Sequence, residues 1–246
     1  DDDTILGMLT LLPCQYRGSH QGKIRLYKAA YLFAVGTLPQ AQGRQIASKL
    51  LSAADDVLKK HGVELALLAP AEPSLYHFYQ KRGYESFFTR RELFFEPKGR
   101  AEHPDTRTLS LKPVSLSEYY PKHINRIPQE SILWDEQTLC FAERESILYG
   151  GGLYVLMDGQ NELCICNIYR YKEEEVIVKE LLLQQGVSQQ QAIEALRDLF
   201  LQCRVTIRLT GTDKENRVPS GMIRFYGPKE DMPENTQMAY LPFLLD

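Results

Sequence analysis

The sequence predicts an α/β (α+β) fold in which helices flank a mixed sheet, arranged as two consecutive domains. Short apolar runs rich in β-formers alternate with stretches of helical period, and one order of strand, helix and strand occurs twice. The chain has 246 residues, of which 43% are hydrophobic and 25% charged, the composition of a globular protein with a real core. Disorder and collagen-like repeats are therefore excluded.

In the first half, the apolar period changes after Pro39 from that of a strand to that of a helix. Ile46, Leu50 and Ala54 lie four residues apart and form a stripe along one helix face. Turn residues follow the first strand at 17–22, and a further strand is expected after the second helix. The expected strands are 4–14, 27–35 and 63–69, and the expected helices are 45–60 and 74–82.

The second half begins after a polar stretch at residues 97–105, which is the best linker candidate in the chain. Ser188, with Gln191 three residues on, forms a capping box at the start of a helix. We therefore predict two domains, residues 1–98 and 105–246. The expected helices of the second are 117–126, 135–147 and 188–202, and its expected strands are 152–157, 162–171, 176–183 and 205–209.

The charge of the chain is unevenly distributed. Residues 1–100 carry 14 Lys and Arg against 10 Asp and Glu, whereas residues 101–246 carry 15 against 22, and the net charge is −3. A net acidic chain argues against a nucleic-acid partner. The scattered cysteines and histidines lack metal or triad spacing, so no metal site is expected. No apolar run has the length of a membrane span and no signal peptide is visible, so we expect a cytoplasmic protein without a membrane partner.

The turn between the second strand and the first helix has the make-up of an anion-binding site. Backbone N–H groups and the positive end of a helix dipole converge there, while Gly43 and Ala47 keep side chains out of the way. Arg44 and Lys49 add positive charge. An ordinary strand-to-helix turn with solvated cations is the alternative reading of this segment taken alone.

This stretch resembles the pyrophosphate-binding motif of the Gcn5-related N-acetyltransferase (GNAT) superfamily, Arg/Gln-x-x-Gly-x-Gly/Ala. Gln42 and Ala47 fit its first and last positions, and Gln45 replaces the usual central glycine. A second stretch, 78–84 with the sequence Phe-Tyr-Gln-Lys-Arg-Gly-Tyr, is similar to the family's Phe-Tyr-x-x-x-Gly-Phe/Tyr. The resemblance covers about residues 4–96.

The resemblance implies that the first domain is N-terminally incomplete, because in this family a strand, two helices and a further strand precede the segment that begins here. Residues 105–246 resemble the degenerate second domain of tandem-GNAT proteins, distantly like the enhanced-intracellular-survival acetyltransferases. The corresponding loop, 183–188, lacks the pyrophosphate pattern, so we expect no second coenzyme site. The expected fold is thus two tandem GNAT-like domains.

The resemblance also implies site residues for acetyl-CoA, used as a co-substrate without a metal. Tyr79 would lie by the thioester sulfur as the catalytic residue, with Tyr76 as the alternative. The backbone of the second strand would pair with the pantetheine arm, and the following loop would hold the diphosphate. The strand residues are Phe33, Ala34, Val35 and Gly36, and the loop residues are Gln42, Gly43, Arg44, Gln45, Ile46 and Ala47.

The general base and the acceptor are left open. The second strand carries no carboxylate, which leaves Glu64, Glu72, the side chain or terminal carboxylate of Asp246, or a residue before the segment. The acceptor is expected to be a small-molecule or peptide amine. The acidic run 173–175 could attract a cationic acceptor, although a solvated hairpin is the plainer reading. Homo-oligomerisation is also left open.

Three functions remain in competition. The first is an acyltransferase that moves an acetyl group from acetyl-CoA to an amine. The second, motivated by Gln45, is an inactive coenzyme-binding or structural GNAT-like module. The third is an aminoacyl-transferring relative of the tandem enzymes that build cell-wall peptides, which would use charged tRNA as donor.

Overall fold

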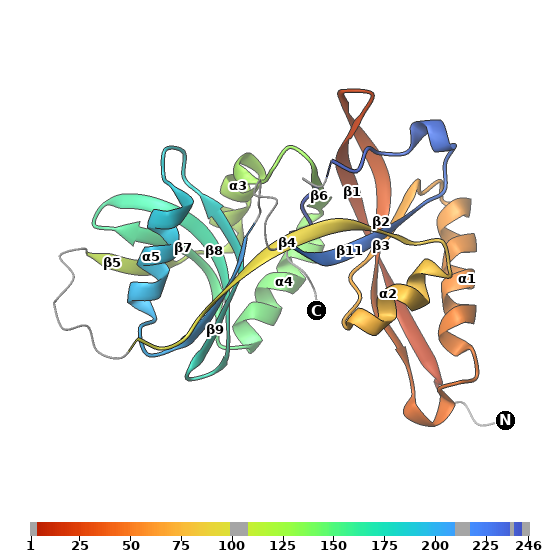
Figure 1. Ribbon diagram of the computed structural model, residues 1–246, viewed down its shortest axis with the longest axis horizontal. Coiled ribbons are helices and arrows are strands. Elements are labelled where there is room, and N and C mark those ends of the chain that lie inside the picture. The colour runs from red at the N-terminus through yellow and green to blue at the C-terminus, as the bar shows by residue number, and fades with distance from the viewer. Residues whose placement is uncertain (1–3, 99–107, 210–216, 237–238, 243–246) are drawn as a thin grey trace.

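The structure, a computed structural model, describes residues 4–98, 108–209, 217–236 and 239–242. Its strands form one mixed sheet in the order β5-β7-β8-β9-β10-β4-β11-β3-β2-β1-β6, flanked by helices (Figure 1). The predicted α/β fold with a mixed sheet is confirmed. The strands are β1 Gly7–His20, β2 Lys23–Thr37, β3 Leu65–Leu68, β4 Glu85–Phe95, β5 Leu109–Pro113, β6 Ser131–Trp134, β7 Gly152–Asp158, β8 Asn161–Lys172, β9 Glu175–Leu183, β10 Arg204–Leu209 and β11 Arg217–Phe225.

The α-helices of the described residues begin and end within three residues of the predicted bounds. The capping box is present, because Ser188 Oγ accepts from Gln191 N and Ser188 N donates to Gln191 Oε1. Two short 3₁₀ turns, η1 and η2, complete the set. The helices are α1 Ile46–Lys60, α2 Pro73–Gln80, α3 Leu116–Arg126, α4 Glu136–Leu148 and α5 Gln189–Leu199, and the 3₁₀ turns are Pro39–Ala41 and Lys229–Asp231.

The first hairpin is longer than predicted. Residues 17–20 were expected to be a turn because they are polar, but β1 continues to His20 and the turn is confined to Gln21 and Gly22. Contacts from later parts of the chain hold this extension. Arg17 Nε donates to Gln129 O at 2.6 Å, and Ser19 Oγ donates to Glu234 Oε2 at 3.1 Å. The local polarity was therefore a poor guide to the strand end.

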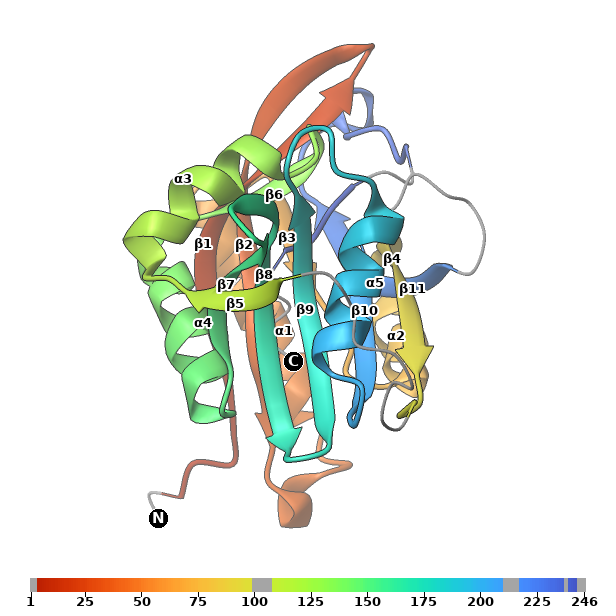
Figure 2. The same ribbon diagram turned by 90° about the vertical axis from the view of Figure 1, so that its left-hand side faces the viewer.

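Two parallel β-α-β units form the framework of the sheet. In one, β2 and β3 are parallel and α1 connects them; in the other, β9 and β10 are parallel and α5 connects them. These units are the two copies of the strand, helix and strand order found in the sequence. Figure 2 shows α5 on one side of the second unit and α3 and α4 on the other.

The two halves exchange their last strands. β4, from the first half, pairs with β10 of the second, and β11, from the second half, pairs with β3 of the first. β4 and β11 also pair with each other and cross the middle of the molecule together (Figure 1). The sequence analysis did not predict β11, β5 or β6. Polar residues and Pro interrupt the apolar pattern of β11 and β5, and β6 has only four residues.

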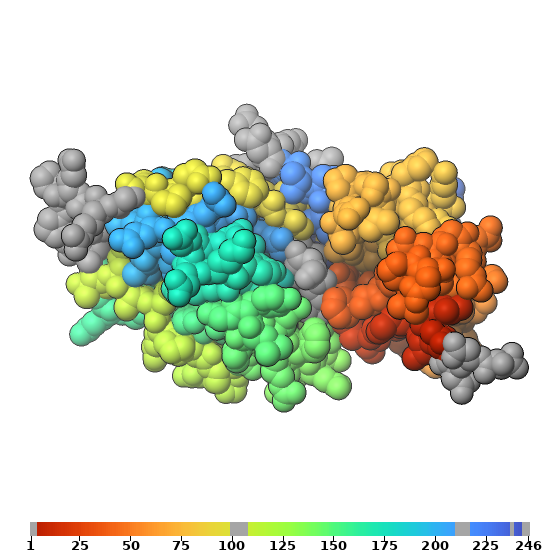
Figure 3. All heavy atoms as spheres, turned by 90° about the horizontal axis from the view of Figure 1, so that it is seen from below, coloured from red at the N-terminus to blue at the C-terminus, as the bar shows by residue number. Residues whose placement is uncertain are grey.

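The core is shared between the halves in the same way. The largest buried cluster combines residues of both, such as Tyr16, Tyr27 and Phe87 with Leu139 and Ile165. In Figure 3 the atoms coloured red to orange gather at one end and those coloured green to light blue at the other. The predicted linker lies largely in 99–107, outside the described residues. The division into domains 1–98 and 105–246 stays a prediction, and neither range contains all the strands that neighbour its own.

Polar side-chain contacts fasten residues 240–242 to the rest of the second half. Tyr240 donates its hydroxyl to Glu180 at 2.6 Å, and Glu180, fully buried, also faces Tyr119 at 2.8 Å and His123 at 3.0 Å. Trp134 Nε1 donates to the backbone oxygen of Pro242 at 2.9 Å. His123 and Trp134 are thus buried packing residues.

Candidate active site

A cavity of about 440 Å³ opens where β2 and β3 part. The parallel pairing extends from Ala29 opposite Leu65 to Tyr31 opposite Leu67; β3 then ends at Leu68, while β2 continues to Thr37. A gap between two diverging parallel strands is a place where a ligand can pair with backbone. The walls come from β2 (31–35), the end of β3 and its following turn (68–73), α2 (Leu75, Tyr76, Tyr79), β4 (Arg90, Glu92) and β11 (218–220).

A bulge in β2 lies on the cavity wall. Met8 is opposite Gly36 and Thr10 is opposite Phe33, so Ala34 and Val35 together face a single residue of β1. Ala34 has a φ of 53°, in the left-handed region that is unfavourable for a residue with a side chain. A bulge leaves backbone groups outside the strand ladder. The strand residues expected to contact the pantetheine arm therefore include three at the cavity, Phe33 to Val35, while Gly36 lies beyond its walls.

The loop after β2 ends in a helix start that no side chain caps. Gln45 occupies the N-cap position without a side-chain cap, and the first bond of α1 runs from Lys49 N to Gln45 O at 3.0 Å. The N–H groups of the first turn therefore have no acceptor within the helix, and the positive end of the helix dipole lies there. Gly43 has a φ of 78° and open space where a Cβ would be. This is the geometry of an anion seat, formed by residues 42–47.

The structure also shows why the family motif favours glycine at the position of Gln45. Its φ of 61° and ψ of 20° place it in the left-handed region, where a residue with a Cβ is destabilised by about 1 kcal/mol or more. The Gln45 side chain is exposed. The left-handed backbone is therefore retained despite the substitution.

Gly7 brings the anion seat close to the end of β2. A Cβ at Gly7 would lie 2.7 Å from Ile46 Cγ2 and 2.9 Å from Gly36 O, so only glycine allows this approach. The cavity and the anion seat are consecutive along the chain and are joined by the end of β2, but residues 42–47 do not line the cavity. An extended ligand could occupy both.

Tyr79 lies in the cavity wall and is 6% exposed. Its ring packs edge-on against Phe78 and Tyr84, with centroids 5.1 and 5.8 Å away. Burial raises the pKa of the Tyr79 phenol, and the charge of Arg82 partly offsets that increase. The phenol is thus protonated at neutral pH and can donate a proton or a hydrogen bond.

Arg82 ties α2 to the first turn of α1. Its Nη1 donates to Phe78 O at 2.5 Å, and its Nη2 donates to Ser48 Oγ. The guanidinium carbon also lies 3.5 Å from the centroid of the Phe78 ring. These contacts hold the helix that carries Tyr79 against the helix that begins at the anion seat. Tyr76, the alternative proton donor, lines the same cavity.

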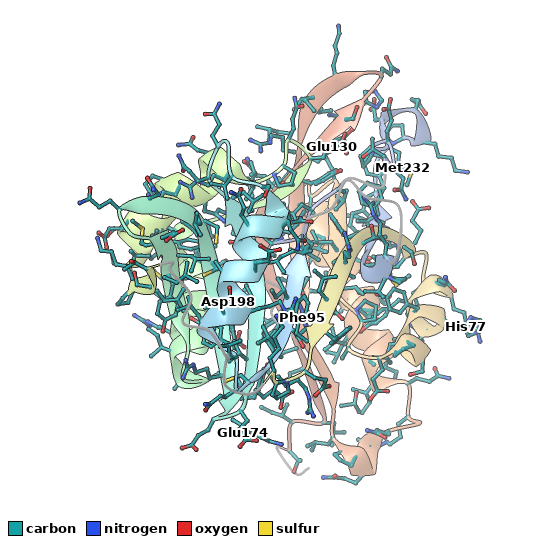
Figure 4. All side chains as sticks on the ribbon, turned by 60° about the vertical axis from the view of Figure 1, so that its left-hand side comes forward. His77, Phe95, Glu130, Glu174, Asp198 and Met232 are labelled. Carbon is teal, nitrogen blue, oxygen red and sulfur yellow. The ribbon has the colours of Figure 1, made fainter. Side chains whose placement is uncertain are left out.

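The structure narrows the candidates for the base. Glu64 lies outside the cavity walls, since its carboxylate accepts from Arg25 Nη2 at 2.5 Å and from the backbone N–H of Lys28 at 3.0 Å. Glu72 lines the cavity from the N-cap of α2 and is exposed. Asp246 lies outside the described residues. The acidic run 173–175 forms the turn of the β8–β9 hairpin. It lines a separate hollow that shares no residue with the cavity. Figure 4 shows Glu174 at the edge of the molecule.

Sequence reasoning missed the cavity residues of β4 and β11. Arg90 and Glu92 interrupt an aromatic strand, an unusual placement that could have marked them. Val218, Pro219 and Ser220 follow the cavity residues of β2 by more than 180 positions, and no local pattern shows that β11 returns to this sheet. Among the described residues, no cluster of His, Cys, Asp and Glu could hold a metal ion, and no helix has the length and apolarity needed to span a membrane.

A comparison with family models matches the part of the chain that contributes most of these residues. Residues 1–87 match the family model described as the acetyltransferase (GNAT) domain. No curated protein matches the chain. The matched residues include the β2 bulge, the anion seat and Tyr79.

Solved structures share the fold over nearly the whole chain. A conserved Enterococcus faecalis protein, described as a probable N-acyltransferase, has a TM-score of 0.63 and 16% identity, with 92% of this chain and 60% of that one covered. Eis1 from Mycobacterium abscessus has a TM-score of 0.63 and 14% identity, with 92% and 63% covered. A GCN5-related N-acetyltransferase from Kribbella flavida has a TM-score of 0.59 and 15% identity, with 92% and 59% covered. This chain thus spans about three fifths of their length.

Proposed function

We propose that the protein transfers an acetyl group from acetyl-CoA to an amine, on the premise that residues 1–87 match the model of the acetyltransferase (GNAT) domain. The observation that carries the proposal is the junction of three features: the cavity between β2 and β3, Tyr79 in its wall, and the anion seat at the start of α1. In this proposal residues 1–98 supply the donor site and residues 105–246, a GNAT-like domain without a coenzyme loop, close the acceptor side.

The donor would lie along β2. The diphosphate of acetyl-CoA would accept hydrogen bonds from the backbone N–H groups of residues 42–47, with Arg44 adding charge. The pantetheine amides would pair with the strand residues from Phe33 to Gly36. The bulge at Ala34 offers backbone groups outside the ladder, which fit an amide or thioester oxygen.

Starting from the ammonium ion, two protons leave the nitrogen, one to the base before attack and one as the amide forms, and one proton reaches the sulfur. An alkylamine with a pKa of about 10.4 is free base only about once in 2,500 at pH 7, so it must first lose a proton. Its nitrogen then attacks the thioester carbon, the C–S bond breaks, and the amide and CoA thiol are released. Tyr79 would protonate or hydrogen-bond the departing thiolate, whose pKa of about 8.5 lies below that of the phenol.

Calorimetric titration of acetyl-CoA into the protein tests the donor site without knowledge of the acceptor. We expect micromolar binding that weakens about tenfold in Arg44→Ala, because a charge-assisted bond to phosphate is lost. Lys60→Ala is the matched control, since Lys60 is an exposed cation at the opposite end of α1 and should leave binding unchanged.

A structural module without coenzyme is the second candidate, and the side chain at Gln45 is the observation that favours it. No binding at millimolar acetyl-CoA would support this candidate. The absence of binding could arise from the Gln45 side chain alone or from the lack of any donor site, and the variant Gln45→Gly distinguishes these two causes. Binding restored by this variant would identify the Gln45 side chain as the obstacle, whereas no binding in either protein would reject the donor site itself. Binding without transfer to any amine would indicate an inactive coenzyme-binding module.

A further inference from the structure

Arg82 carries a positive charge at the start of α1. It fills a variable position of the Phe-Tyr-x-x-x-Gly stretch, two residues beyond the end of α2. Its Nη2 donates to the hydroxyl of Ser48, the third residue of α1, and its Nη1 donates to the backbone oxygen of Phe78 at 2.5 Å. The guanidinium therefore lies against the first turn of α1, beside the anion seat at residues 42–47.

No carboxylate among the described residues pairs with Arg82. Both of its hydrogen bonds end on uncharged oxygens, and its guanidinium carbon lies 3.5 Å from the centroid of the Phe78 ring. By contrast, Arg224, which also contacts α1, pairs with Asp55 of that helix. A guanidinium has five N–H donors, and the Arg82 side chain is only half-buried. Its charge and its remaining donors are therefore available to an anionic ligand.

The first turn of α1 adds backbone donors beside this guanidinium. The first bond of the helix runs from Lys49 N to Gln45 O, so the N–H groups of residues 46–48 have no acceptor within the helix. The positive end of the helix dipole lies at the same place. Because Ser48 belongs to this turn and is bonded to Arg82, the side-chain donors and the backbone donors lie side by side.

The charge of Arg82 also reaches the cavity. Burial raises the pKa of the Tyr79 phenol, and the charge of Arg82 lowers that pKa again. Tyr79 lines the cavity, whereas Ser48 directly follows the anion seat. Arg82 is thus a cation close to both parts of the donor site.

Arg82 is better prepared than Arg44 to recognise a phosphate group. Arg44 is exposed and has no side-chain bond to another residue in the part of the chain that the structure describes. Arg82 is held by Ser48, by the backbone of Phe78 and by the Phe78 ring. A guanidinium that is already fixed loses less side-chain freedom when it binds. We therefore expect Arg82 to discriminate between ligands with and without phosphate.

We propose that Arg82 binds a phosphate group in the nucleotide half of the donor, so that the protein selects CoA thioesters over pantetheine thioesters that lack this half. This inference rests on the proposed function, because it concerns the donor side of the same site. The diphosphate and the 3′-phosphate of CoA offer the same chemistry to a guanidinium, and the experiment distinguishes them.

The test compares acetyl-CoA with S-acetylpantetheine, which has the same thioester and pantetheine arm but no phosphate. Calorimetry and ligand-observed NMR titration give the two Kd values, and their ratio is the readout. In Arg82→Gln we expect the preference for acetyl-CoA to fall about tenfold, because a charge-assisted bond to phosphate is lost. Arg82→Lys should keep part of the preference, since it retains the charge but not the planar fork.

Dephospho-CoA, which lacks only the 3′-phosphate of CoA, identifies the phosphate that Arg82 contacts. If Arg82→Gln weakens dephospho-CoA and CoA by the same factor, the contact is with the diphosphate. If it weakens only CoA, the contact is with the 3′-phosphate. If it weakens neither ligand, the proposal is wrong.

A purely structural role for Arg82 gives a different result. If Arg82 only fastens α2 to α1, Arg82→Gln weakens acetyl-CoA and S-acetylpantetheine alike, and the unchanged ratio overturns the proposal. Salt is a second readout: raising KCl from about 50 to about 300 mM should weaken acetyl-CoA binding less in Arg82→Gln than in the wild type, because screening acts on a charge pair. The matched control is Lys60→Gln, which removes an exposed cation at the far end of α1 and should keep the wild-type ratio.

These measurements separate the inference from the proposed function. They need no acceptor, so the ratio still decides the role of Arg82 if acetyl-CoA binds without being used. If acetyl-CoA does not bind, the proposed function fails, and titration with inorganic pyrophosphate tests Arg82 by itself. Pyrophosphate binding that weakens about tenfold in Arg82→Gln supports the phosphate contact. Equal binding to both proteins, or binding to neither, overturns it.

Discussion

Tyr79 was singled out by a sequence motif and lines the cavity in the structure. The sequence predicted it from a motif, and the structure places it in the wall of the cavity, with its pKa raised by burial and its helix fixed by Arg82. The motif could not show which of Tyr76 and Tyr79 approaches the sulfur, because both line the cavity. Their roles remain predictions.

The substitution Tyr79→Phe tests the proton donor. We expect kcat to fall about 10- to 100-fold with little change in acetyl-CoA affinity, because the ring is kept and only the donor is removed. Since burial raises the pKa of Tyr79, the loss should be similar across pH 7 to 9, where the wild-type phenol stays protonated. The measurement is the release of the CoA thiol with an amine that the wild-type protein acetylates, and Tyr76→Phe is the matched comparison. Equal kcat in wild type and Tyr79→Phe would remove Tyr79 from this role.

At the scale of single elements, β11 was not predicted from the sequence, yet it lies in the middle of the sheet. It lies between β3 and β4 and is antiparallel to both, with register shifts around Pro219 and Gly221. A Cβ at Gly221 would lie 3.0 Å from Phe88 Cδ2, 3.0 Å from Leu241 Cδ2 and 3.3 Å from Leu68 O. The close fit of this strand therefore leaves little room for a side chain at Gly221.

Gly221→Val should destabilise the protein by about 1–3 kcal/mol, because the new methyl groups overpack the space between β3 and β4. Urea denaturation followed by circular dichroism measures the change in the free energy of unfolding. Ser110→Val, which adds the same side chain at an exposed position of the edge strand β5, should change stability by less than about 0.5 kcal/mol. An unchanged midpoint for Gly221→Val would show that β11 can shift to accommodate it.

At the scale of the whole molecule, the two halves depend on each other through β4 and β11. β3, buried at all four positions, has β11 as one of its two neighbours, and the cavity is lined by β11 as well. The halves are related by the same β-α-β order, yet each gives its last strand to the other. The cavity is therefore lined by strands of both halves.

A fragment of residues 1–98 tests this dependence. Without β11, the edges of β3 and β4 are unpaired, so we expect no cooperative thermal unfolding and no acetyl-CoA binding. Co-expression with residues 105–246 should restore both. Cooperative unfolding of the fragment alone, seen by circular dichroism or calorimetry, would instead show that residues 1–98 are an independent domain.

The sequence by itself determined the elements whose signals are local. The helical stripe of α1, the capping box at Ser188 and the order of strand, helix and strand all arise from neighbouring residues, and the helix bounds agree within three residues. The anion seat and Tyr79 were also predictable, since a loop and a helix turn carry their own motifs. The predicted end of β1 was wrong because distant residues, Gln129 and Glu234, form hydrogen bonds with its polar end.

Only the tertiary structure decided which strands are neighbours and what completes the cavity. Pairing between strands depends on backbone hydrogen bonds and packing across more than a hundred residues, and a strand does not encode its partner in its own period. The exchange of β4 and β11 and the place of Arg90 and Glu92 in the cavity follow from that pairing. The part of the cavity wall that contains Tyr79 was thus predictable from local sequence, whereas the part formed by β4 and β11 was set by contacts between the halves.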